Sequence, residues 1–186
     1  MNEIASQSQL RMSYVRWALF TVPAIMFLGF LSGQLANSGY RNRWFAALEK
    51  PDFMPPAWIF PVAWSLLYLL LGLAIAMILH ARGARFRGIA ILLFVVQLAA
   101  NYAWSPLFFR AHMVMEAFWL ILLIFLVSAV TAILFARIRP AAALMMLPYL
   151  AWLIFAAMLT QGVGQLNPGA SDLEPPQGKS HIDMRI

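Results

Sequence analysis

Residues 117–163 decide the fold class, and they read AFWLILLIFLVSAVTAILFARIRPAAALMMLPYLAWLIFAAMLTQGV. Two charge-free apolar runs, 117–136 and 141–163, are separated here only by residues 137–140, RIRP. At about 1.5 Å per residue, a helix of either run crosses a hydrocarbon core of roughly 30 Å. The runs lack the alternation of a strand, and in lipid the backbone must satisfy its own hydrogen bonds. The short link therefore predicts two antiparallel, neighbouring transmembrane helices.

Three further charge-free runs of similar length precede this pair, and they cover residues 17–35, 58–79 and 89–109. Of the 186 residues, 63% are hydrophobic and only 11% are charged. A soluble domain is closer to half apolar and a quarter charged. The sequence therefore predicts an all-α membrane protein with a bundle of five transmembrane helices. The same composition excludes a soluble enzyme and a disordered chain.

The runs divide the chain into an N-terminal segment (1–16), a membrane domain (17–166) and a polar tail (167–186) that we expect to be disordered. The first run exceeds the usual ~7–15 apolar residues of a signal peptide, so we expect a retained helix.

Seven arginines lie in the N-terminal segment and in the links after the second and fourth helices, against four basic residues near the membrane on the other side. Positive-inside bias predicts a cytoplasmic N-terminus and an outside loop over 36–57.

Several kinds of chemistry have no residues to support them. The chain has no cysteine, and His80, His112 and His181 lie at helix ends or in the tail. This pattern argues against a metal site and against haem held by a histidine. We find no catalytic triad pattern, phosphate loop or paired carboxylates. The net charge is +6. The basic residues lie between the apolar runs, where they act as signals for membrane orientation rather than as a nucleic-acid surface. We expect no metal, no required cofactor and no nucleic-acid partner.

Aromatic and amide side chains recur at helical spacing on three of the predicted helices. The stripe of helix 58–79 contains Trp64 and Tyr68. The stripe of helix 89–109 contains Gln97, Asn101, Trp104 and Phe108, and that of helix 141–163 contains Tyr149, Trp152, Ala156 and Thr160. Residues three or four apart share a helix face, and amides at this depth should point into the bundle. From spacing alone, a ligand pocket and plain interhelical packing are equally supported.

Other residues of the same types have simpler interpretations. We expect interfacial anchors at Trp17, Trp44, Trp58 and Trp119, because tryptophan favours the membrane–water boundary. Gly29 and Gly33 form a GxxxG motif, which indicates a close helix contact either within the chain or between chains.

Three longer motifs resemble one known family. They are WFAALEKP (44–51) continuing into PPAWIFPVAW (55–64), QLAANYAWSPLFF (97–109) and LPYLAW (147–152). Compound motifs of this length at this spacing are specific. Over roughly residues 17–167 the chain resembles the translocator protein, or tryptophan-rich sensory protein, family (TspO/MBR), and in particular its bacterial members.

The resemblance implies a five-helix protein of the bacterial cell membrane, usually a homodimer, with Gly29 and Gly33 as a candidate contact. It implies a porphyrin ligand of the protoporphyrin IX type, held between the helices under the first loop, in a sensor or scavenger. Family pocket positions match Trp64, Tyr68, Asn101, Trp104, Trp152 and Ala156, with Trp44 in the loop lid. We add Tyr149 as a ligand-binding candidate from its place in the stripe.

Two alternative functions remain open at this stage. Some relatives are reported to photo-oxidise protoporphyrin with two tryptophans that match Trp64 and Trp152, which implies a light-dependent enzyme. The other alternative is a transporter of porphyrins or other amphipathic molecules, although we find no internal repeat of the kind transporters use.

The chemistry of a porphyrin adds candidates around the pocket. Its carboxylates suit charge-assisted bonds to Arg41, Arg43 and Lys50 at the pocket mouth, and its ring suits stacking on indoles. The chain departs from many relatives at Phe53, Tyr102 and Thr160. It also lacks the C-terminal cholesterol-recognition pattern of the animal proteins, so steroid transport is not supported.

Overall fold

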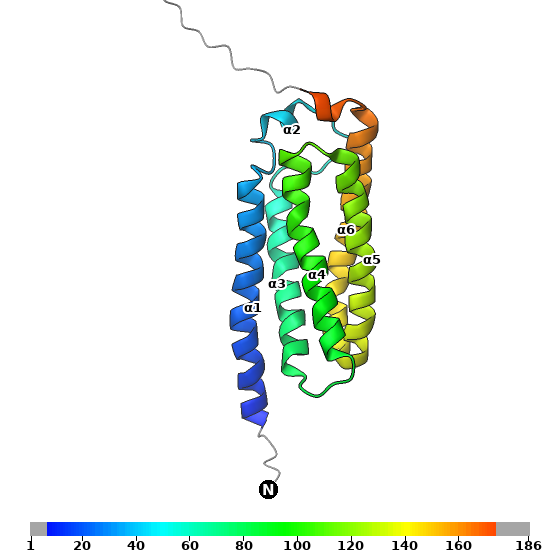
Figure 1. Ribbon diagram of the computed structural model, residues 1–186. Helices are drawn as coiled ribbons and strands as arrows, with labels where there is room; N and C mark the ends of the chain where they lie inside the picture. Colours follow the sequence, from blue (N-terminus) through cyan, green and yellow to red (C-terminus); the bar gives the residue numbers. More distant parts are fainter. Residues whose placement is uncertain (1–6, 174–186) are drawn as a thin grey trace, which may run out of the picture.

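Five long helices form the body of the protein (Figure 1). The computed structural model describes the backbone of residues 7–173 and the side chains of residues 12–173. The long helices are α1 (Gln7–Leu35), α3 (Ile59–His80), α4 (Arg87–Ser105), α5 (Val114–Ile138) and α6 (Pro140–Leu166), with the shorter α2 (Arg43–Ala47), η1 (Pro106–Arg110) and η2 (Ala170–Asp172). All five are long and apolar enough to cross a membrane. The predicted all-α, five-helix membrane fold is confirmed.

The observed bounds agree with the predicted runs to within three residues for the last four spans, when η1 is counted with α4. The first helix differs, because α1 begins at Gln7 rather than Trp17. The expected start of the first helix at Trp17 is therefore wrong, and residues 1–6 lie outside the described chain. The search for apolar runs did not find this extension of α1. Polar residues can continue a helix beyond the membrane, and they do not form part of an apolar run.

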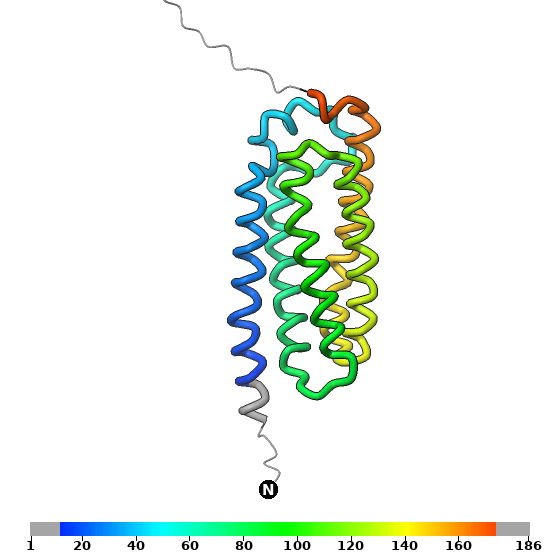
Figure 2. Tube along the Cα trace, in the orientation of Figure 1, coloured from blue at the N-terminus to red at the C-terminus, as the bar shows by residue number. Residues whose placement is uncertain are grey.

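The helices are arranged so that α3 lies against α1 on one side and α6 on the other, while α5 lies between α4 and α6. The predicted antiparallel pair is the α5–α6 pair, joined by a single residue between Ile138 and Pro140. The trace in Figure 2 shows the loop that contains α2 crossing the same end of the bundle as the α4–α5 connection. The opposite end carries the α3–α4 and α5–α6 connections.

Glycines allow α1 and α3 to approach closely. A Cβ added to Gly72 would lie 2.7 Å from the Cα of Val22, and one added to Gly29 would overlap the ring of Tyr68. The hydroxyl of Thr21 donates to the Gly72 carbonyl at 2.8 Å. Gly29 of the predicted GxxxG motif is thus engaged within the chain, and it is not available for a contact between two copies.

A proline in the second motif, QLAANYAWSPLFF, ties α4 to α1. Pro106 has no N–H, so the carbonyl of Tyr102, four residues earlier, lacks its helical donor. The hydroxyl of Ser32 on α1 donates to that carbonyl instead. The helix continues from Pro106 as a π-helix, and the Tyr102 hydroxyl donates to the Ile25 carbonyl at 2.8 Å. Tyr102, one of the departures from the family pattern, is therefore a link between α1 and α4.

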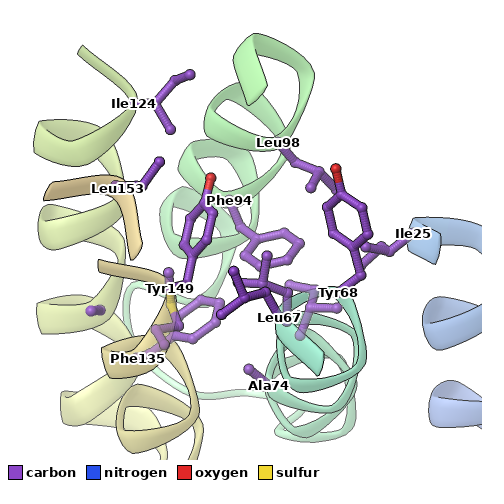
Figure 3. Packing of buried hydrophobic residues seen from close by; sticks show 14 of the residues in the cluster. Ile25, Leu67, Tyr68, Ala74, Phe94, Leu98, Ile124, Phe135, Tyr149 and Leu153 are labelled. Carbon is purple, nitrogen blue, oxygen red and sulfur yellow. The ribbon is translucent and has the colours of Figure 1, made fainter. Parts of the chain in front are cut away.

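The core lies along the inner faces of the helices, as Figure 3 shows for residues of all five. The rings of Phe94 and Phe135 stack at 5.8 Å there. The outer faces expose large apolar side chains, such as Leu19 at 70% and Leu126 at 62%. Such faces suit lipid. Trp58 and Trp119 are also exposed, in agreement with their predicted role as anchors, whereas Trp44 is buried and is not one.

We expect Gly72→Ala to destabilise the bundle, because the added methyl meets the backbone of Val22. Forcing helices apart in this way costs about 1–3 kcal/mol. Thermal unfolding in detergent, followed by circular dichroism, measures the change. Gly88→Ala is the matched control, since nothing lies within 4 Å of its added Cβ. Equal stability of the two variants would contradict a tight α1–α3 contact.

Candidate functional site: an aromatic cluster beneath a latched loop

Aromatic rings from α3 and α6 meet inside the bundle. The rings of Trp64 and Trp152 lie edge to face, with centroids 6.3 Å apart and an interplanar angle of 78°. Tyr68 lies 5.1 Å from Trp64, one helical turn along the same face. Phe60 lies 6.1 Å from Trp152, and Tyr149 lies 6.5 Å from Trp64. We call these five residues the aromatic cluster; both of its tryptophans are partly buried.

Amides on α4 bind the hydroxyls of this cluster. The Gln97 side-chain oxygen accepts hydrogen bonds from the hydroxyls of Tyr149 at 2.8 Å and Ser128 at 3.1 Å. The Asn101 side-chain oxygen accepts from the Tyr68 hydroxyl at 3.3 Å. Four helices are thereby joined through two amides, and Figure 3 shows Tyr68 and Tyr149 directed into the bundle from α3 and α6. The predicted polar stripe of α4 does face the interior.

Two buried donors on α4 have no partner among the described residues: Nε2 of Gln97 and Nε1 of Trp104. Gln97 is completely buried, so its amide N–H groups cannot turn to water. A buried donor without an acceptor is unfavourable, typically by about 1–3 kcal/mol. Gln97 was noted in the sequence only as a member of the stripe, and the structure makes it the central polar residue of the site.

The remaining predicted pocket residues are Trp104 on α4 and Ala156 on α6, and both pack against the central core. Trp104 stacks on Phe108, with centroids 5.0 Å apart and planes at 12°. It packs against both clusters of buried apolar residues, the central one and the one at the loop end of the bundle. Ala156 is partly buried against the central core. Its carbonyl accepts the hydroxyl of Thr160 at 2.8 Å. Thr160, one of the expected departures from the family pattern, therefore uses its hydroxyl within its own helix.

Trp44 belongs to a second cluster of buried residues, together with Phe45, Phe108 and Phe109. Its ring stacks on His112 with centroids 4.2 Å apart and planes at 10°, and its Nε1 donates to the Ala170 carbonyl at 2.7 Å. Burial lowers the pKa of His112, and a hydrogen bond with the Phe109 backbone acts in the opposite direction. Trp44 is 2% exposed. The structure thus does not bring Trp44 together with Trp64 and Trp152; it anchors the loop.

The loop that carries Trp44 is fastened to both neighbouring helix ends. Asn42 caps α2 by accepting from the Phe45 amide at 3.1 Å, and it donates to the Phe109 carbonyl at 2.9 Å. Asn167 accepts from the Glu49 amide and donates to the Glu49 carbonyl, both at 2.9 Å. Pro51 packs so closely on α6 that a Cβ at Gly162 would lie 3.2 Å from its ring. We call the contacts of Asn167 and Ala170 with the loop the latch.

The latch corrects one prediction and adds residues that the sequence did not single out. We expected disorder from residue 167, but η2 and the contacts of Asn167 and Ala170 show order as far as residue 173. Residues 174–186 lie outside the described chain. The composition of the tail could not reveal the latch. The segment is polar, and it is held by hydrogen bonds to backbone groups rather than by burial of apolar side chains. Asn42, before a helical turn, did offer a capping signal.

The three basic candidates of the loop differ in their surroundings. The Lys50 ammonium donates to the carbonyls of Phe45 at 2.8 Å and Leu48 at 2.7 Å, and it lies 4.9 Å from the Phe45 ring centroid. Burial lowers the pKa of Lys50. Its donors are thus occupied by the end of α2, and it is not a free partner for a carboxylate. Arg41 and Arg43 are exposed.

Fold and site together define a class: a multi-pass, five-helix membrane protein with a tryptophan-lined interior beneath a fastened loop. The family model described as TspO/MBR family matches residues 20–166. The chain belongs to the TspO/MBR family.

Curated relatives agree with this assignment. Translocator protein of Ovis aries is 39% identical over 156 residues, which cover 80% of this chain and 92% of the relative. Tryptophan-rich sensory protein of Cereibacter sphaeroides is 33% identical over 147 residues, covering 76% and 91%. Protein CrtK of Rhodobacter capsulatus is 35% identical over 127 residues, covering 68% and 79%. The family resemblance inferred from the three motifs is confirmed.

We expect Asn167→Ala to loosen the loop, because the Glu49 amide loses its acceptor and the Glu49 carbonyl loses a donor. Each hydrogen bond contributes about 0.5–1.5 kcal/mol, so exchange of the amides around Glu49 should accelerate at least about five-fold. Hydrogen–deuterium exchange measures this. The exposed Gln165→Ala is the control. Unchanged exchange in Asn167→Ala would show that the latch does not hold the loop.

Proposed function

We propose that this TspO/MBR-family membrane protein binds a tetrapyrrole of the protoporphyrin IX type and acts as a sensor or scavenger for it. The observation that carries the proposal is the contact of two indole rings, Trp64 on α3 and Trp152 on α6, at 6.3 Å in the bundle interior. Indole faces stack on large flat rings, and each aromatic pair contributes about 0.5–1.5 kcal/mol beyond area burial. The names of the relatives, translocator protein and tryptophan-rich sensory protein, are compatible with this role.

Binding requires the site to open. Carbon atoms in contact are about 3.5–4.0 Å apart, so a planar ligand between two parallel indoles needs roughly 7 Å between their faces. The two rings now touch edge to face. One ring must therefore rotate or α3 and α6 must separate, and we propose that release of the loop permits this movement. The unpartnered donors of Gln97 and Trp104 favour a ligand that carries hydrogen-bond acceptors.

The carboxylates of such a ligand have two candidate partners. Arg41 and Arg43 are exposed on the loop and can form charge-assisted hydrogen bonds with a propionate. Lys50, the third predicted candidate, already donates to backbone carbonyls. We therefore propose Arg41 and Arg43, and not Lys50, as propionate partners.

The membrane placement is proposed as well. We place the protein in a bacterial cell membrane with its N-terminus in the cytoplasm, because positive-inside bias favours that side. The loop with α2 then lies outside. A homodimer stays a prediction, and its contact must use residues other than Gly29.

We expect Trp64→Leu with Trp152→Leu to weaken protoporphyrin IX binding about ten-fold or more, since two stacking contacts are lost. Titration of the purified protein, followed by the porphyrin absorption band, measures the affinity. Trp119→Leu is the control, because Trp119 is 62% exposed on the outer face. The proposal fails if the double variant and the control bind with the same affinity as the unaltered protein.

Light-dependent porphyrin oxidation is the second candidate, and the same two indoles favour it. An indole in contact with the excited porphyrin donates one electron to it, and the porphyrin passes that electron to dioxygen, which becomes superoxide. The oxidised indole then regains an electron from the porphyrin ring, so the net change is one-electron oxidation of the porphyrin and one-electron reduction of dioxygen. Such a reaction needs no general acid or base from the protein. The oxidation reaction depends on the ability of the indoles to give up an electron, whereas binding alone depends only on the flat shape of the rings.

Trp64→Phe with Trp152→Phe separates the two candidates, because phenylalanine keeps an aromatic face but is much harder to oxidise than tryptophan. Under light and dioxygen, the unaltered protein should convert bound protoporphyrin IX into a product with a new absorption band. The double variant should bleach the porphyrin only at the rate of the free compound. Identical product formation in both would exclude the indoles as electron donors.

A further inference from the structure

A pocket of about 350 Å³ opens at the end of the bundle opposite the loop. Its wall comes from three helices that are distant in sequence: the start of the α1 span, the end of α3 and the start of α6. The lining residues are Tyr14, Met77, His80, Arg139, Pro140 and Ala141. Figure 1 shows all three of these helix ends at the end of the bundle that also carries the α3–α4 connection. The pocket lies at the level of the span ends, where lipid headgroups are found.

The charge at this end is entirely positive among the described residues. Six arginines lie there, namely Arg16, Arg82, Arg85, Arg87, Arg137 and Arg139, whereas the described acidic residues, Glu49, Asp52, Glu116 and Asp172, belong to the opposite half. Arg87 is occupied, because it donates to the carbonyls of Ile78 and Leu79 at 3.0 and 2.8 Å. Arg139 is exposed and lines the pocket.

The pocket combines polar and apolar walls. Met77, Pro140 and Ala141 supply apolar residues to the lining, and Tyr14 and Arg139 supply a polar and a charged one. His80 also lines it, and its Nδ1 is buried without a hydrogen-bond partner among the described side chains and backbone. Helix α6 begins at this wall without a side-chain cap, so its N-terminal dipole adds partial positive charge. Such a combination suits an anionic group that carries an acyl chain.

We propose that this pocket binds an anionic phospholipid of the surrounding bilayer. Arg139 pairs with the headgroup phosphate, the Tyr14 hydroxyl donates to it, and the acyl chain leaves along Met77 and Ala141. Basic pockets between transmembrane helices are suited to such headgroups. The site is separate from the aromatic cluster, and it stands whether or not that cluster binds a tetrapyrrole.

The test uses the full-length protein and native mass spectrometry, with dioleoylphosphatidylglycerol and dioleoylphosphatidylcholine as probes and inorganic phosphate as competitor. We expect at least a ten-fold preference for phosphatidylglycerol. Arg139→Gln should reduce that preference about five-fold. Arg82→Gln, an exposed arginine at the same end but outside the pocket, should change it less than two-fold.

A second variant tests the cavity independently of charge. Ala141→Trp keeps every arginine but fills the pocket, and it should also remove most of the preference for phosphatidylglycerol. Because Arg139 and Ala141 are exposed, thermal unfolding should show both variants folded. The proposal is overturned if Arg82→Gln and Arg139→Gln act equally, since diffuse surface charge then explains binding. It is also overturned if Ala141→Trp has no effect, or if millimolar inorganic phosphate displaces the lipid.

Discussion

The bundle depends on polar contacts between helices that lipid cannot replace. Apolar side chains gain little by leaving acyl chains for one another, so close packing and interhelical hydrogen bonds hold transmembrane helices together. Here the side-chain oxygen of Gln97 joins α4 to α5 and α6, and Thr21 joins α1 to the carbonyl of Gly72 on α3. Tyr102 completes the set by bonding α4 to α1. Each helix is thus attached through at least one polar group.

Hydroxyls of the aromatic cluster bind Gln97 and Asn101, so the cluster and the scaffold share residues. Tyr149 packs near Trp64 while its hydroxyl binds Gln97, and Tyr68 packs on Trp64 while its hydroxyl binds Asn101. A ligand that separates these rings must also strain the contacts between helices. Under the proposed function, ligand binding and the arrangement of the helices would be coupled for that reason, as a sensor requires.

The loop above the cluster is not a flexible cover. Asn42 attaches it to the end of η1, Trp44 stacks on His112 between η1 and α5, and Asn167 attaches it to the end of α6. Its fastenings are therefore on the two helices that border the site. Movement of α6 relative to α4 would pull on the loop directly.

The sequence by itself determined the five spans, the pairing of the last two helices and the inward direction of the α4 stripe. These properties follow from local constraints, because any long apolar segment in lipid must satisfy its own backbone as a helix. Spacing could also place Trp64 and Tyr68 on one face, although it could not tell a pocket from packing.

Only the tertiary structure decided the partners of individual side chains. Trp44 anchors the loop rather than joining the aromatic cluster, Lys50 closes the end of α2, Gly29 admits the ring of Tyr68, and Asn167 begins a latch instead of a disordered tail. Each of these outcomes depends on distances between segments far apart in the chain. Composition and periodicity report which way a residue faces, but not which residue of another helix lies opposite it.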